Sequence, residues 1–147
     1  MTVAVVNHCT LPEDLYYLVE RHVWARPDGD LVTVGLSDVA QNLARTIISV
    51  TLKSPGRMVA KGKNAATVES GKWVGPVPAP VSGEIVEVNE ALRTSPATIN
   101  ADPYGAGWIA RIRATDWAGD SADLATGEPG IAAYREFLDR EGIACGG

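Results

Sequence analysis

Concentrated positive charge and long apolar runs are both missing from this sequence. It has 13 basic residues against 18 acidic ones, for a formal net charge of −5. Because a nucleic-acid surface needs clustered lysines and arginines to neutralise phosphates, nucleic acid is excluded as a partner. No apolar run approaches the roughly 18 residues of a membrane helix. The start also lacks the basic and apolar regions of a signal peptide. We therefore expect a cytoplasmic protein with no membrane partner.

Cysteine and histidine are scarce as well. The two cysteines, Cys9 and Cys145, lie near opposite ends of the sequence, which is no disulfide framework. We expect both thiols to be reduced and the C-terminal tail to fray, and a part for either thiol in the chemistry stays open. His8, Cys9 and His22 lack the spacing of zinc ligands, so no metal site is expected. We interpret His22 as a packed or hydrogen-bonded histidine in a strand.

The motifs of common catalytic sites are also missing. The sequence has no Gly-x-Ser-x-Gly elbow of the kind that holds a hydrolase nucleophile. The basic turn at residues 60–64 lacks the glycine and lysine pattern of a phosphate-binding loop. Neither a hydrolase nor a nucleotide-binding enzyme is therefore indicated.

The patterns that are present predict a mainly β fold with small helices. With 147 residues and 46% hydrophobic content, the chain is large enough for one domain with a core. Turn residues recur often, and helical periodicity is rare before the last thirty residues. Helices are predicted at 39–44, capped by Ser37-Asp38, and from Ser95-Pro96. The predicted strands are 23–26, 31–36, 46–52, 65–70, 74–81, 84–88 and 108–113.

The last thirty residues have a different pattern, which predicts a C-terminal amphipathic helix over 129–144. One face carries Ile131, Tyr134, Leu138 and Glu141, and Gly142 is a suitable stop. We expect this helix to cover the sheet.

The most informative stretch is a predicted hairpin with Lys72 at its tip. Gly71 relaxes the backbone before the lysine, while Glu69 and Ser70 keep the tip in solvent. Pro76, Pro78 and Pro80 fall at period two in the second arm, which must therefore be an edge strand. A lysine at such a tip is usually only solvated, but a modifying enzyme could also reach its amine there. Because free lysine has a pKa of about 10.4, that enzyme would have to supply the activation.

From about residue 17 to residue 113, the sequence resembles the glycine cleavage H-protein family. The matching segments are 32–41, 68–72, 80–92 and 100–108. In that family the lysine of a Glu-Ser-x-Lys motif carries lipoic acid as an amide, and this position falls on Lys72. The resemblance implies a barrel-sandwich hybrid of antiparallel strands, the lipoyl/biotinyl carrier fold, and a carrier that is not itself an enzyme. It implies a single lipoyl-carrier domain over 1–147, with a core at about 17–113 and a helical extension at about 120–144.

Several positions depart from the usual pattern of that family. Its His-Glu-Trp is His22-Val23-Trp24 here, and Trp73 stands where a small residue normally follows the modified lysine. The segments 11–17, 22–27 and 71–78 resemble the lipoate-binding proteins of the sulfur-oxidising heterodisulfide-reductase-like pathway. This second resemblance implies that the arm on Lys72 shuttles sulfur intermediates of thiosulfate or sulfane oxidation.

The partners expected from this resemblance are a lipoate–protein ligase and the heterodisulfide-reductase-like complex, with the carrier as a monomer. Glu69, Ser70, Gly71 and Trp73 are the expected flanking recognition residues. Trp73 would shield the dithiolane, dock on a partner, or pack along the hairpin. Two alternatives stay open: an H protein carrying an aminomethyl group in glycine cleavage, and an unmodified β-domain that acts as a binding module.

Overall fold

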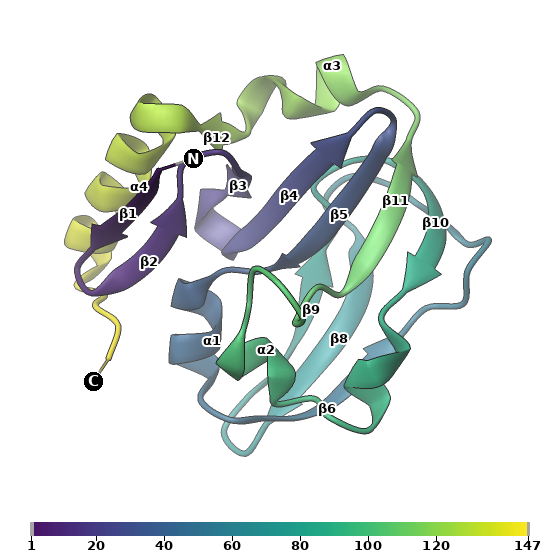
Figure 1. Ribbon diagram of the computed structural model, residues 1–147, viewed down its shortest axis with the longest axis horizontal. Coiled ribbons are helices and arrows are strands. Elements are labelled where there is room, and N and C mark those ends of the chain that lie inside the picture. The colour runs from purple at the N-terminus through teal and green to yellow at the C-terminus, as the bar shows by residue number, and fades with distance from the viewer. Residues whose placement is uncertain (1, 147) are drawn as a thin grey trace.

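The computed structural model describes residues 2–146, and within them the strands form three antiparallel sheets (Figure 1). A two-stranded hairpin holds β1 (Val3–Val6) and β2 (Cys9–Pro12). The seven-stranded sheet runs β12 (Ala125–Thr126), β3 (Tyr16–Leu18), β4 (Val23–Asp28), β5 (Leu31–Leu36), β11 (Ala110–Ala114), β10 (Gly83–Val88) and β7 (Met58–Val59). The three-stranded sheet runs β6 (Ile47–Leu52), β8 (Asn64–Ser70) and β9 (Val74–Pro78).

The two larger sheets share one apolar core. Val34 and Ile112 of the seven-stranded sheet belong to the same buried cluster as Val68 and Val77 of the three-stranded sheet. In Figure 1 the three-stranded sheet lies behind β5 and β11. Neither sheet closes on itself. The predicted mainly β fold is therefore confirmed, and β9 is the edge strand that its prolines require.

The short helices lie in the connections between strands. They are α1 (Asp38–Ala44), α2 (Thr98–Ala101), α3 (Trp117–Asp120) and the 3-10 turns η1 (Val19–Arg21), η2 (Glu90–Arg93) and η3 (Ser121–Asp123). The hydroxyl of Ser37 caps α1 as predicted, accepting the Ala40 N–H at 3.4 Å. The predicted start of a helix at Ser95-Pro96 is early: these residues form the turn after η2, and α2 begins at Thr98.

The C-terminal helix α4 (Gly127–Glu141) covers one end of the seven-stranded sheet and the β1–β2 hairpin (Figure 1). Ile131, Tyr134 and Leu138 are buried in a second cluster with residues of both, as the periodicity predicts. Glu141 of the predicted face is exposed, because the helix ends there and Gly142 turns the chain with φ of 69°. Within residues 2–146, no helix combines the length and apolar character needed to cross a membrane.

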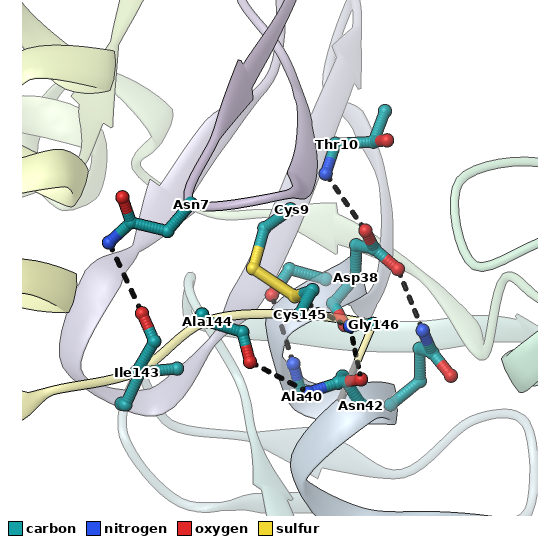
Figure 2. The surroundings of a disulfide bond; sticks show 12 residues. Asn7, Cys9, Thr10, Asp38, Ala40, Asn42, Ile143, Ala144, Cys145 and Gly146 are labelled. Atoms are coloured by element: carbon teal, nitrogen blue, oxygen red, sulfur yellow. Dashed lines mark hydrogen bonds between the residues drawn. A yellow bond between two sulfur atoms is a disulfide. The ribbon is translucent and has the colours of Figure 1, made fainter.

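A disulfide between Cys9 and Cys145 contradicts the prediction of reduced thiols. The two residues are 136 positions apart, and their Cα atoms lie 5.0 Å from each other. The predicted frayed tail is also wrong: the Cys145 N–H donates to the Asn7 carbonyl at 2.9 Å. The tail is further held by Asn42 of α1, which bonds both Ala144 and Gly146 (Figure 2). The cause is tertiary, because α4 runs back beside the β1–β2 hairpin and delivers Cys145 to Cys9.

Candidate functional site

Lys72 lies at the tip of the β8–β9 hairpin, as predicted. Glu69 pairs with Val74, and the Ser70 N–H donates to the Trp73 carbonyl at 2.7 Å, so Gly71 and Lys72 are the two central residues of a tight turn. Lys72 is exposed, and within residues 2–146 its side chain makes no hydrogen bond or ion pair. The amine is therefore accessible to a modifying enzyme.

The residues that flank Lys72 do not all face solvent. Glu69 and Gly71 are exposed, but Ser70 is 4% exposed, so the expectation that it keeps the tip in solvent is wrong. Its hydroxyl lies 3.4 Å from both the Trp73 carbonyl and the Lys72 N–H, and this side chain therefore braces the turn from inside. Trp73 is 43% exposed and folds back over Gly75 of β9.

A pocket of about 340 Å³ lies beside the lysine. Its walls come from three parts of the chain: the hairpin, the end of β5 with α1, and η1 with the residue after it. Most of the lining is apolar, and the polar members other than Lys72 lie on η1 and at His22. The lining residues are Lys72, Trp73, Pro76, Leu36, Ala40, Leu43, Ala44, Glu20, Arg21 and His22. A small, mainly apolar group tethered to Lys72 would fit such a pocket.

His22 is the most constrained polar residue of this pocket. It lies after η1 with φ of 59°, so the prediction that it belongs to a strand is wrong. The prediction of a packed, hydrogen-bonded ring is confirmed: Nδ1 lies 2.6 Å from the Tyr134 hydroxyl, and the two rings stack 5.7 Å apart. Burial lowers the pKa of His22 to about 4, so the imidazole is neutral at neutral pH. Within residues 2–146, no group of three or more side chains could hold a metal ion.

The pocket itself was missed by sequence reasoning. Its lining residues lie in separate segments, and no spacing rule connects positions 20–22, 36–44 and 72–76. Leu43 of α1 lines the pocket and is 42% exposed, but this exposure is set by packing and is not marked by the sequence pattern.

Comparison with known proteins places this geometry in a family. The model of the family described as "Glycine cleavage H-protein" matches residues 15–138. The chain is 48% identical to glycine cleavage system H protein 2 of Aquifex aeolicus over 139 residues, covering 94% of this chain and 86% of that protein. It is 44% identical to the glycine cleavage system H protein of Thermus thermophilus over 131 residues, covering 89% and 98%.

A solved structure shows the same fold. The crystal structure of a glycine cleavage system H protein from Mycobacterium marinum matches with a TM-score of 0.74 and 35% identity, covering 90% of this chain and 99% of that one. Together with the family model and the curated relatives, this match shows that the chain belongs to the glycine cleavage H-protein family, a family of lipoyl carriers.

Proposed function

We propose that Lys72 carries lipoic acid, joined as an amide to its ε-amine, and that residues 1–147 form a single lipoyl-carrier domain. The observation that carries this proposal is the exposed lysine at the centre of a tight turn, whose side chain is unpaired within residues 2–146. A lipoate–protein ligase would reach the Lys72 amine and recognise Glu69, Gly71 and Trp73, while Ser70 stabilises the turn. The carrier would act as a cytoplasmic monomer.

The pocket beside Lys72 fits the dithiolane end of such an arm. Leu36, Ala44 and Trp73 offer apolar walls, and Pro76 extends them along β9. When bound, the cofactor supplies a dithiol that can exchange with a disulfide and hold a small group on sulfur. The residues of the chain would orient this end and exclude water from it.

The names of the relatives favour a glycine cleavage role over a sulfur role. By this reading the protein is the H protein of that system, its arm carries an aminomethyl group, and its partners are the glycine-cleaving enzymes. Robust glycine–bicarbonate exchange with those enzymes would support it.

A second candidate role is sulfur transfer to a heterodisulfide-reductase-like complex. It is favoured by Val23, which stands where the family usually has glutamate and is fully buried next to His22. Of the described residues that line the pocket, Glu20 is the one carboxylate left to pair with a cationic aminomethyl group. Failure of glycine–bicarbonate exchange, with loss of growth on thiosulfate when the host carries Lys72→Arg, would support this role.

The attachment itself is tested by the intact mass of the protein isolated from its host. We expect a lipoyl increment that maps to Lys72 and disappears in Lys72→Arg, while the variant keeps the wild-type circular dichroism and melting temperature. An unmodified wild-type chain, or an increment that survives in Lys72→Arg, would leave the protein as a binding module instead.

A further inference from the structure

Three polar groups form a chain that ends at the pocket. The hydroxyl of Ser37 lies 3.1 Å from that of Tyr134, which in turn lies 2.6 Å from Nδ1 of His22. Ser37 is fully buried and Tyr134 is fully buried, so neither hydroxyl can turn to water instead. The direction of the hydrogen bonds in this chain can therefore be worked out from the protons available.

The proton of Ser37 decides the direction. The Ser37 oxygen already accepts the Ala40 N–H at 3.4 Å. Among residues 2–146, the Tyr134 oxygen is the acceptor that lies within reach of the Ser37 O–H. Ser37 therefore donates to Tyr134, and Tyr134 donates to Nδ1 of His22. A buried hydroxyl proton would be left without an acceptor if this order were reversed.

An imidazole that accepts at Nδ1 carries its proton on Nε2. Burial lowers the pKa of His22, which keeps the ring in this neutral form. Every buried side-chain nitrogen and oxygen among the described residues has a partner, yet the hydrogen bond shown for His22 is at Nδ1. Nε2 is therefore open to solvent, on a ring that lines the pocket together with Lys72 and Trp73.

The charged side chains of the pocket do not by themselves favour an anionic or a cationic group on the arm. Arg21 and Glu20 both line the pocket and both are exposed, so solvent screens them. An amide at Lys72 would remove the charge of that lysine. The Nε2–H of the partly buried His22 is then the fixed polar feature, and a donor prefers a group with lone pairs or negative charge.

We propose that His22 is a specificity-determining residue, whose Nε2–H binds an anionic or lone-pair-bearing group on the arm, such as a persulfide, in preference to a cationic aminomethyl group. The inference rests on the proposed attachment of the arm at Lys72. It deepens the second candidate role, sulfur transfer, and it makes Tyr134 and Ser37 positioning residues that fix the imidazole tautomer.

The tautomer is tested directly on lipoylated protein by long-range proton–nitrogen NMR of the imidazole. We expect His22 to carry its proton on Nε2 at neutral pH, and Tyr134→Phe, which keeps the stacked ring, to give a mixture of tautomers. A proton on Nδ1 in the wild type would overturn the assignment, as would an unchanged tautomer in Tyr134→Phe.

Cargo selection is tested by shielding of the arm. The reduced arm is loaded with sulfane sulfur from inorganic polysulfide, and its alkylation by iodoacetamide is followed by mass spectrometry. We expect His22→Asn, which tolerates the positive φ, to raise this rate roughly tenfold through loss of one charge-assisted hydrogen bond. The rate of release of an aminomethyl group, measured on the same variant, should change much less than the alkylation rate. Equal effects on both cargoes, or none on the persulfide, would overturn the proposal.

Failure of this inference is distinguishable from failure of the attachment. The intact mass of the wild type and of each variant is measured before the assay. A missing lipoyl increment in the wild type counts against Lys72 as the carrier site. A full increment with unchanged shielding in His22→Asn counts against His22 alone.

Discussion

The indole ring of Trp73 lies directly over the α-carbon of Gly75. A β-carbon built onto Gly75 would stand 2.0 Å from Cζ2 of the ring, far inside any allowed contact. The glycine therefore creates the space in which the ring lies along β9 and forms one wall of the pocket beside Lys72.

Gly75→Ala should displace this ring without unfolding the protein. Trp73 is 43% exposed, so it can swing outward, and we expect a stability change of less than about 1 kcal/mol. Acrylamide quenching, read as the difference from Trp73→Phe, should show greater exposure of the indole. Gly71→Ala is the matched control, because its new β-carbon meets nothing within 4 Å. Equal quenching in both variants would contradict the contact.

Gly35→Ala should have a much larger effect, although the clash is of the same kind. Its β-carbon would lie 2.5 Å from the ring of Trp24, which is fully buried. That ring cannot swing away, because its Nε1–H donates to the Leu36 and Pro103 carbonyls, each at 3.0 Å. We expect a loss of roughly 1–3 kcal/mol in the free energy of unfolding, measured by urea denaturation. An unchanged midpoint would mean that the backbone of β5 yields more easily than this packing allows.

The disulfide should make stability depend on reductant. Cross-linking residues 136 positions apart restricts the unfolded chain, and such a bridge stabilises a fold by roughly 2–5 kcal/mol. We expect dithiothreitol to lower the urea midpoint of the wild type. Cys145→Ser should start at the lower midpoint and show no response to reductant. If dithiothreitol also lowers the urea midpoint of Cys145→Ser, the reductant does not act through the Cys9–Cys145 disulfide.

Acid should weaken the fold through His22. Burial lowers the pKa of His22 to about 4 from its ordinary value of 6.5, so the unfolded chain binds the proton first as the pH falls. The free energy of unfolding should therefore fall between about pH 6.5 and about pH 4, by on the order of 3 kcal/mol from this group. Carboxylates titrate near the end of this window, so the loss is read as the difference between wild type and His22→Asn. Parallel pH profiles would contradict the prediction.

Local patterns predicted the parts of the fold that depend on neighbours in sequence. The strand at 31–36, the cap at Ser37 and the helix stop at Gly142 all lie where the sequence pattern indicated. The β1–β2 hairpin was missed, although its turn residues Asn7 and His8 both have positive φ. Asn is one of the few residues that adopt this conformation readily, and that signal was available.

The site divides in the same way. The position of Lys72 at an exposed tip was predicted from a single hairpin, whose turn residues and flanking strands are continuous in sequence, and its modification remains a proposal. The pocket depends on η1 and α1 being carried to that hairpin by the sheets, and no local rule contains this information. The burial of Ser70 and the pairing of Cys9 with Cys145 were misjudged for the same reason, since both are set by packing between distant segments.

The Cys9–Cys145 bridge also gives the molecule a mechanical property. Tension applied to the segments outside these two positions passes through the sulfur–sulfur bond, and the hairpin that bears Lys72 lies within the closed loop and carries none of it. An unfoldase that translocates the polypeptide would have to pass two segments of the chain at once when it reaches the disulfide. Once the bond is reduced, the same pull reaches α4 and the sheets behind it, so the oxidation state sets which part of the carrier bears the load.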